Sequence, residues 1–203
     1  TVKAPNPEAK EAFALGLTLA KKVGAELVMA TDPDGDRLGI YALDSESGKY
    51  KEFTGNMSGA LLCEYVLSQL QEKGTLPENA AVTSTVVITS MIRNICKEYG
   101  VFCDDNNLIG FKYIAGKIRD YEQTGSHTYV FGLEESYGCL PGTYARDKDA
   151  VGTVMLLAEA AAYYKDKGMT LWDQMKVLFE KYGYYRENIE TMTLEGKSGA
   201  QKI

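Results

Sequence analysis

The sequence is poor in the residues that bind zinc or build disulfide frameworks. Its 203 residues include one histidine and four cysteines, and no two cysteines form a C-x-x-C pair. A structural zinc site takes four such ligands at close spacing, so this class of site is not expected. We therefore expect reduced and mostly buried thiols, as in a cytoplasmic protein, at Cys63, Cys96, Cys103 and Cys139.

Long apolar runs are also missing. No segment approaches the roughly 20 consecutive apolar residues that a membrane-spanning helix requires. The first residues, Thr1 to Pro5, do not combine a basic start with an apolar core, so they are not expected to form a signal peptide. A membrane is therefore not an expected partner.

Basic residues do not predominate either. Lysine and arginine total 22 against 28 aspartates and glutamates, which gives a formal net charge of -6. Binding to a nucleic-acid backbone favours a basic surface, so nucleic acid is not an expected partner. Small phosphorylated ligands remain possible, because one local cluster of lysine and arginine can bind them.

Hydrophobic periodicity predicts strands and helices in alternation. Strands are expected over residues 26–31, 38–43, 50–53, 80–87, 101–104, 128–133 and 184–194. Helices are expected over residues 9–20, 58–70, 90–99, 110–122, 150–165 and 170–182, with a long polar loop over 134–149. This alternation predicts an α/β fold in which mixed, mainly parallel sheets carry flanking helices.

Two clusters of turn residues lie close together between residues 44 and 57. They place a domain boundary there and divide the chain into residues 1–47 and 48–203. The first piece is too small to bury a comfortable core of its own. We therefore expect residues 1–47 to be part of a larger domain.

An acidic loop, Thr31-Asp32-Pro33-Asp34-Gly35-Asp36-Arg37, follows a strand that is expected to be buried. Carboxylates at alternate positions can converge on one hard cation, which also offsets their mutual repulsion. The planar guanidinium of Arg37 suits two phosphate oxygens. Open α/β sheets bind ligands at the carboxyl ends of their strands, where this loop is expected.

The acidic loop has two other interpretations. A calcium EF-hand begins with the same D-x-D-x-D pattern, but its sixth position is glycine and its twelfth is glutamate. Counted from Asp32, these positions hold Arg37 and Leu43, and the flanks are strand-like. The EF-hand interpretation therefore fails, and a solvated turn stays as the alternative to metal binding.

Two later loops carry further candidate residues. In the loop 132–138, the carboxylate of Glu134 and the hydroxyl of Ser136 can bind neighbouring hydroxyls of a sugar, although an exposed acidic loop is the default interpretation of this run taken alone. In the loop 142–149, Arg146 and Lys148 can face a phosphate or a transferring proton, although these residues taken alone favour a surface charge cluster. Lys112 lies off the expected core face of its helix and can reach a cleft.

Together these segments resemble the α-D-phosphohexomutase superfamily, the phosphoglucomutase/phosphomannomutase type. The run DPDGDR resembles its magnesium loop and GLEESYG its sugar-binding loop, while TGN, LIGFKYI and RDKDAV fit the same pattern in the same order. The resemblance implies four α/β domains around a cleft, of which this chain holds the later part of the second and nearly all of the third.

Two elements of that family have no counterpart in this sequence. No segment fits the Thr-Ala-Ser-His-Asn-Pro type loop that carries the phosphoserine in the first domain. None fits the Arg-x-Ser-Gly-Thr phosphate loop of the fourth domain. The resemblance therefore implies that the first and fourth domains of the same protein are partners of this chain, together with a phosphorylated hexose.

The resemblance also implies residue roles. Magnesium would be bound by Asp32, Asp34 and Asp36, and the transferring phosphoryl group would lie beside Arg37. The 3- and 4-hydroxyls of the sugar would be held by Glu134 and Ser136. Acid/base work would fall to Lys148, with further substrate contacts from Arg146 and Lys112.

The implied reaction interconverts hexose 1-phosphate and hexose 6-phosphate. A phosphoserine donates its phosphoryl group, and glucose 1,6-bisphosphate serves as intermediate and activator. The Glu-Glu-Ser-Tyr form of the sugar loop is more similar to glucose-preferring relatives than to those with Glu-Met-Ser, while mannose and pentose phosphates stay open. Without the phosphoserine, this chain alone is expected to be inactive.

Two functions of other classes compete with the mutase. A haloacid-dehalogenase-type phosphatase would use Asp32 as its nucleophile, but such enzymes have Thr or Val after the second aspartate, where this chain has Gly35. A non-catalytic metal-binding module would need only the acidic loop. A preference for calcium over magnesium would favour the module.

Overall fold

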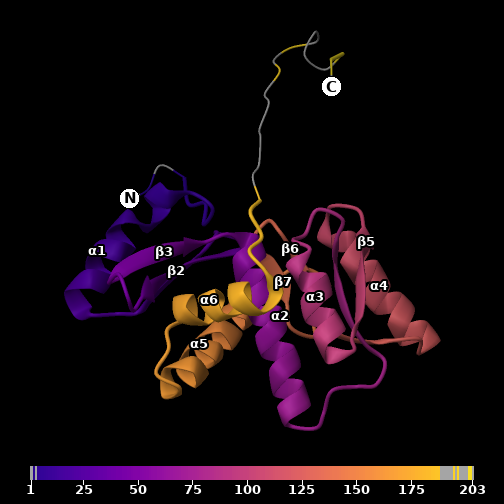
Figure 1. Cartoon of the computed structure of the whole chain (residues 1–203). Coiled ribbons are helices and arrows are strands. Elements are labelled where there is room, and N and C mark those ends of the chain that lie inside the picture. Colours follow the sequence, from indigo (N-terminus) through magenta and orange to yellow (C-terminus); the bar gives the residue numbers. More distant parts are fainter. Residues whose placement is uncertain (1, 3, 188–193, 195, 197–200, 203) are drawn as a thin grey trace.

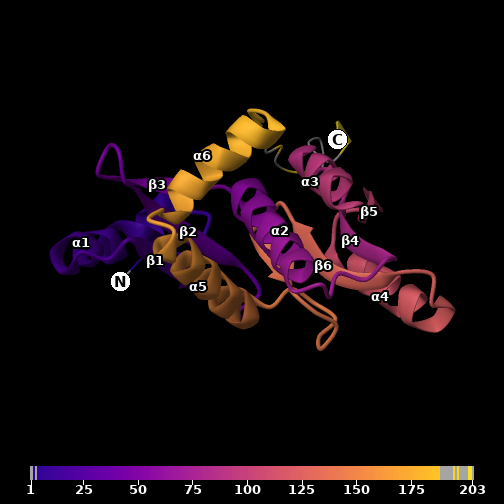
Figure 2. The same cartoon turned by 60° about the horizontal axis from the view of Figure 1, so that its bottom comes forward.

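The α/β architecture is confirmed in a computed structural model that describes residues 2, 4–187, 194, 196, 201 and 202 (Figure 1). Strands β1–β3 form one sheet, and strands β4–β7 form a second. Helices α2, α5 and α6 lie between the two groups of strands in Figure 2. Helix α2 contacts β3 of the first sheet and β6 of the second, so it joins them.

The first sheet is a three-stranded antiparallel meander of β1 (Leu27–Thr31), β2 (Leu38–Asp44) and β3 (Lys49–Phe53). Thr31 pairs with Leu38, so the acidic loop closes a β-hairpin. The loop follows the carboxyl end of β1 as expected, and the sheet that it leaves is antiparallel. Strand β1 is only half-buried, against the prediction, because among the described residues it is an edge strand that β2 pairs on one side.

A helical segment precedes this sheet. It starts as a short 3₁₀ helix, η1 (Lys10–Phe13), and continues as α1 (Ala14–Val23) until Gly24 adopts a left-handed φ of +70°. The ring of Phe13 is buried against Tyr41, with ring centroids 4.8 Å apart. This contact anchors the helical segment on β2.

The second sheet has the strand order β5-β4-β6-β7 and is mainly parallel, as predicted. Strands β4 (Ala80–Thr85), β5 (Phe102–Asn107) and β6 (Thr128–Glu134) run parallel, and β7 (Gly138–Leu140) pairs antiparallel with β6. The expected long loop over 134–149 therefore contains a strand. Three residues are too few to show the period-2 alternation by which strands are detected.

The helices of the second sheet are α2 (Gly55–Glu72), α3 (Met91–Tyr99) and α4 (Phe111–Thr124). Strand β4 ends two residues before the predicted limit, because Val86 and Val87 turn outward and are about half exposed. The predicted strand over 184–194 is not found over 184–187, which have no regular structure, and its later part lies outside the described residues.

Two helices close the fold, α5 (Ala150–Asp166) and α6 (Leu171–Tyr182). The side chain of Asp149 accepts a hydrogen bond from the N–H of Val151 and caps α5. Thr170 and Asp173 form a reciprocal capping box at the start of α6. Both helices therefore begin directly after a polar residue whose side chain caps the helix.

One hydrophobic core runs through both groups of strands. It includes Ile40 and Phe53 of the first sheet, Phe131 of the second, and Leu157 and Met175 of the closing helices. The domain boundary between residues 47 and 48 stays a prediction, and β3, which follows it, pairs with β2. The two parts of the described chain are thus packed as one body.

The thiols lie as expected. Cys63, Cys96 and Cys139 are buried, Cys103 is half-buried, and all four are free. Among the described residues, no helix has the length and apolar character needed to cross a bilayer.

Asp173 is expected to make the stability of the fold depend on pH. Burial acts to raise the pKa of Asp173, but hydrogen bonds from Thr170, Ser45 and Lys176 outweigh it and lower the pKa from 3.8 to about 2. The ionised carboxylate therefore stabilises the fold above about pH 4, and this contribution is lost as the pH falls through 2. Asp173→Asn should lower the free energy of unfolding at pH 6 by about 2 kcal/mol.

Urea denaturation at pH 6 and at pH 2.5 measures this difference. The variant should differ much less from the parent chain at the lower pH. Asp166→Asn, at an exposed position of α5, is the control and should change stability by no more than about 0.5 kcal/mol. An equal loss for Asp173→Asn at both pH values would contradict the assignment.

Candidate functional site

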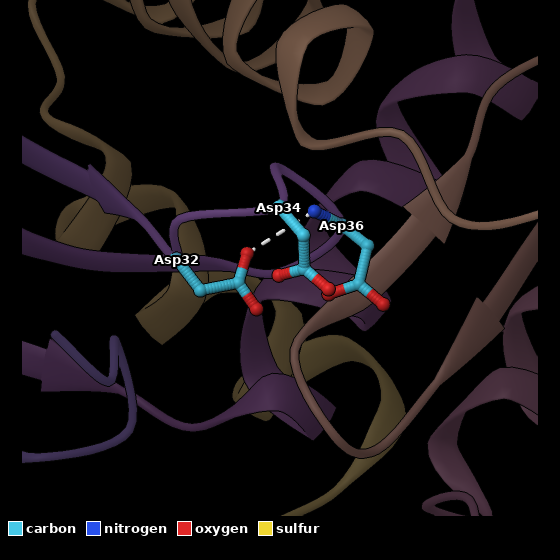
Figure 3. A group of neighbouring side chains, drawn as sticks. All are labelled: Asp32, Asp34 and Asp36. Carbon is cyan, nitrogen blue, oxygen red and sulfur yellow. Dashed lines mark hydrogen bonds between the residues drawn. The ribbon is translucent and has the colours of Figure 1, made fainter.

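The acidic hairpin loop is organised by Asp32. This residue is 3% exposed, and its Oδ1 atom accepts a hydrogen bond of 3.1 Å from the N–H of Asp36 (Figure 3). The same atom accepts a second, of 3.0 Å, from the N–H of Arg37. The N–H of Gly35 donates to the carbonyl of Asp32, and Gly35 takes a φ of +71°. That conformation favours glycine, so the loop needs glycine at position 35 to turn back.

The three aspartates converge. One carboxylate oxygen from each of Asp32, Asp34 and Asp36 lies within 4.8 Å of the others, and the side chains gather on one side of the loop (Figure 3). The Oδ1 atom of Asp36 is buried and has no hydrogen-bond partner among the described residues. Its ionic contact with Arg37 Nε is long, at 3.7 Å. A buried oxygen without a hydrogen bond, beside two more carboxylates, fits a hard divalent cation.

The guanidinium of Arg37 forms ion pairs with Asp32 and with Glu8. Its Nε atom lies 2.7 Å from Asp32 Oδ2, and one terminal nitrogen lies 2.9 Å from Glu8 Oε1. Burial acts to raise the pKa of Asp32, but the hydrogen bonds from Arg37 outweigh it and hold the pKa well below its usual range. The partnership with Glu8 had no signal in the sequence, since 29 residues separate the two.

The pKa of Asp36 shifts in the opposite direction. Burial raises it, and the neighbouring Asp32 adds to the rise, while Lys148 acts to lower it. Two carboxylates with pKa values displaced in opposite directions mark a site where like charges are held together. A cation bound there would relieve the repulsion.

The sugar-loop candidate Glu134 ends β6 and is 4% exposed. Its Oε1 atom accepts a hydrogen bond of 2.9 Å from the N–H of Gly110. Burial raises the pKa of Glu134, against the opposing effects of Gly110 and Lys148. The neighbouring Glu135 accepts from Thr85 instead, so the two adjacent glutamates have different partners.

The turn between β6 and β7 holds Ser136, which is half-buried. It also holds Tyr137, whose φ of +65° is unusual for a residue with a side chain. The carbonyl of Tyr137 accepts a hydrogen bond of 2.9 Å from the N–H of Leu38, at the end of the acidic loop. This hydrogen bond links the turn to the hairpin. The strained backbone of Tyr137 therefore lies in a candidate binding loop.

Lys148 lies between the two loops. Its Nζ atom is 2.9 Å from Asp36 Oδ2, 3.1 Å from Asp147 Oδ1 and 3.7 Å from Glu134 Oε2. Burial acts to lower the pKa of Lys148, but Asp36 and Asp147 outweigh it and raise the pKa. The structure thus brings Asp36, Lys148 and Glu134 into one cluster.

The remaining candidates lie apart from that cluster or point elsewhere. The guanidinium of Arg146 makes two contacts of 2.7 Å with the carboxylate of Glu122 on α4. Lys112 is exposed, and its Nζ atom lies 5.1 Å from the ring centroid of Tyr113. Substrate contacts by Arg146 and Lys112 stay predictions.

Glycine positions near the site were missed by the sequence reasoning. A Cβ atom added to Gly55, in the first turn of α2, would lie 1.9 Å from the carbonyl oxygen of Glu135. Gly110, whose N–H binds Glu134, has a φ of +117°. Both glycines stand within the TGN and LIGFKYI segments, which were noted only for their resemblance.

Family models match this chain over the regions that contain these segments. Residues 54–182 match the family described as "Phosphoglucomutase/phosphomannomutase, alpha/beta/alpha domain III", and residues 1–45 match domain II of the same family. The chain belongs to the phosphoglucomutase/phosphomannomutase family. The resemblance inferred from DPDGDR and GLEESYG is thereby confirmed.

Relatives show how much of a family member the chain represents. It is 36% identical over all 203 residues to the phosphoglucomutase of Staphylococcus haemolyticus (strain JCSC1435), and it covers 36% of that protein. A Thermus thermophilus structure of the phosphomannomutase type matches with a TM-score of 0.64 at 21% identity, over 87% of this chain and 35% of that one. The chain spans about a third of these relatives.

A more distant structure shares the fold. Aspergillus fumigatus N-acetylphosphoglucosamine mutase, solved in complex with GlcNAc-6P and magnesium, matches with a TM-score of 0.52 at 17% identity. The match covers 76% of this chain and 32% of that one. The α/β arrangement of this chain is therefore shared with a protein that is named for a different sugar.

Arg37 is expected to be important for stability. The side chain of Asp32 is 1% exposed, and Arg37→Met would leave it buried without its ionic partner. Breaking a buried pair from one side costs about 3–5 kcal/mol. Urea denaturation at pH 7 should show a loss of about this size.

Lys10→Met is the matched control. Lys10 pairs with Glu52 at 3.2 Å, but its side chain is 77% exposed, so the change should cost less than about 1 kcal/mol. If the two substitutions had equally small effects, Arg37 would not be the group that holds Asp32 ionised.

Proposed function

We propose that this chain forms the metal- and sugar-binding part of a phosphohexomutase that interconverts hexose 1-phosphate and hexose 6-phosphate. The full reaction would use a phosphoserine from another part of the longer protein and a hexose 1,6-bisphosphate intermediate. The observation that carries the proposal is the position of Lys148, whose ammonium contacts both Asp36 and Glu134. Metal and sugar ligands would therefore share one cluster.

Asp32, Asp34 and Asp36 would hold Mg²⁺. Their converging carboxylates support this, as does the Asp36 oxygen that accepts no hydrogen bond from the residues the structure describes. The magnesium in the Aspergillus fumigatus structure also supports it. A bound Mg²⁺ would stabilise negative charge on a transferring phosphoryl group. Arg37 would add positive charge at the same place, because its side chain is 32% exposed and can be reached by the phosphoryl group.

Glu134 and Ser136 would bind two neighbouring hydroxyls of the hexose. One oxygen of Glu134 is held by Gly110, which leaves Oε2 beside Lys148 to accept from a sugar hydroxyl. An acceptor and a donor two residues apart suit a sugar that must bind in two orientations, because each orientation can present a similar pair of equatorial hydroxyls. Glucose phosphate is the proposed substrate, on the Glu-Glu-Ser-Tyr form of this loop.

Lys148 would do the acid/base work of the transfer. Its raised pKa keeps it protonated at neutral pH, so it would give its proton to the oxygen that leaves the phosphorus. It would take the proton of the attacking hydroxyl only in its neutral form. Its ammonium would also offset charge between the two ligand sites. Arg146 and Lys112 would contact substrate only after leaving their present partners, Glu122 and the ring of Tyr113.

The phosphatase alternative is disfavoured by the surroundings of Asp32. Both of its oxygens are occupied, one by two backbone N–H groups and the other by Arg37 Nε. A nucleophilic carboxylate needs an exposed oxygen directed at the phosphorus, and this residue is 3% exposed. The non-catalytic metal module stays the second candidate, since the aspartate cluster alone would serve it.

Magnesium binding tests the metal site directly. Asp34 is the exposed member of the cluster, so Asp34→Asn should leave the fold intact while removing one ligand charge. Isothermal titration calorimetry should show at least a tenfold weaker Mg²⁺ affinity, about 1.4 kcal/mol. Asp166→Asn should leave the affinity unchanged, and a strong preference for Ca²⁺ over Mg²⁺ would favour the non-catalytic module.

Turnover of the longer protein tests the sugar site. Glu134→Gln should lower kcat/KM for glucose 1-phosphate roughly 10- to 100-fold in a coupled assay, because a charged hydrogen bond to the sugar is lost. Glu78→Gln, at an exposed position, is the matched control. The 203-residue chain alone should show no turnover, and robust conversion by it would contradict the proposed division of the reaction.

A further inference from the structure

Lys148 reaches the two carboxylates by lying across the bare backbone of Gly138 in β7. A Cβ atom added at Gly138 would lie 2.0 Å from Cδ of Lys148, 2.6 Å from its Cγ and 3.1 Å from its Cβ. These three atoms form the stem of the side chain, not its mobile end. The path of the lysine therefore occupies the space that any side chain at position 138 would fill.

The backbone itself does not demand glycine at this position. Gly138 lies in an extended strand, a conformation that every residue adopts, and it is not among the glycines with positive φ. Gly35, in the acidic loop, is the contrasting case, because its φ of +71° disfavours a side chain whatever the space. At position 138 the three atoms nearest to an added Cβ all belong to Lys148, so this side chain is the first obstacle to a larger residue.

The stem has little freedom to move aside. The N–H of Asp149 donates to the carbonyl of Cys139 at 2.9 Å, which fixes the backbone next to Lys148 along β7. The N–H of Lys148 donates to Asp147 Oδ1 at 2.8 Å, and its ammonium lies 5.6 Å from the ring centroid of Phe111. With its Cβ atom anchored in this way, Lys148 can avoid an added methyl group only by rotating its side chain elsewhere.

We propose that Gly138 is a positioning residue that directs the Lys148 ammonium to the point between Asp36 and Glu134. A side chain at position 138 turns the ammonium out of this cluster and into solvent. The functional consequence rests on the acid/base role proposed above for Lys148. The placement itself is a property of the chain without metal or substrate.

Chemical labelling of the metal-free chain tests the placement. The Lys148 side chain is 13% exposed, so it should react slowly with a limiting amount of an acetylating N-hydroxysuccinimide ester, as followed by peptide mass spectrometry. In Gly138→Ala the labelling rate of Lys148 should rise at least fivefold, while that of Lys176 in α6 stays constant. Gly116→Ala is the matched control, because a Cβ atom there meets nothing within 4 Å.

A double-mutant cycle on thermal stability provides a second test, which applies even if Gly138→Ala folds poorly. Lys148→Ala removes the stem, so Gly138→Ala should lower Tm in the parent chain by several degrees and much less in the Lys148→Ala background. An unchanged labelling rate for Lys148, or a rise shared equally by Lys176, would overturn the proposal. So would an equal loss of Tm in both backgrounds.

These measurements separate the inference from the proposed function. Neither labelling nor thermal unfolding requires magnesium, sugar or turnover. If the chain failed to bind Mg²⁺ while Gly138→Ala still released Lys148, the proposed metal-binding function would fail and the positioning role would stand. If Mg²⁺ bound but Lys148 labelling did not change, the positioning role would fail and the proposed metal-binding function would stand.

Discussion

One ammonium group, that of Lys148, joins the two candidate ligand sites of this chain. It lies 2.9 Å from Asp36 and 3.7 Å from Glu134, and it is largely buried. The carboxylates gathered in so small a space would repel one another without such a group. The arrangement of the acidic hairpin and the sugar loop therefore depends on where this lysine is held, and the position is fixed by its neighbours along β7 and not by its own flexible stem.

The two loops are also fastened through the backbone. The N–H of Leu38 binds the carbonyl of Tyr137, and the N–H of Ala150 binds the carbonyl of Gly35. Both bonds connect the acidic hairpin with residues that come far later in the chain. Together with a hydrophobic core that includes Phe53, they make the acidic hairpin and the sugar loop parts of one packed unit. Small side-chain changes at the cluster are thus expected to act locally.

Sequence reasoning reached the classes of element and the charged residues of the site, since periodicity and the D-x-D-x-D run are local signals. It did not reach strand pairing: β1–β3 are antiparallel, and β7 is too short to detect. It also missed partners distant in sequence, such as Glu8 for Arg37 and Gly110 for Glu134. These contacts follow from tertiary packing, which no single segment encodes. The glycines of the site can be read from the sequence. Which other residue occupies the place of their missing side chain can be read only from the structure.

The bond from Ala150 to Gly35 has an electrostatic consequence. Ala150 is the first residue of α5, so the amino end of a 17-residue helix abuts the acidic loop. The aligned peptide dipoles of a helix amount to roughly half a positive charge at that end. Unlike a dissociable ion, this partial charge is permanent. Helix α5 therefore attenuates the repulsion among the aspartates at all times, and it helps the hairpin to keep its shape whether or not a cation is present.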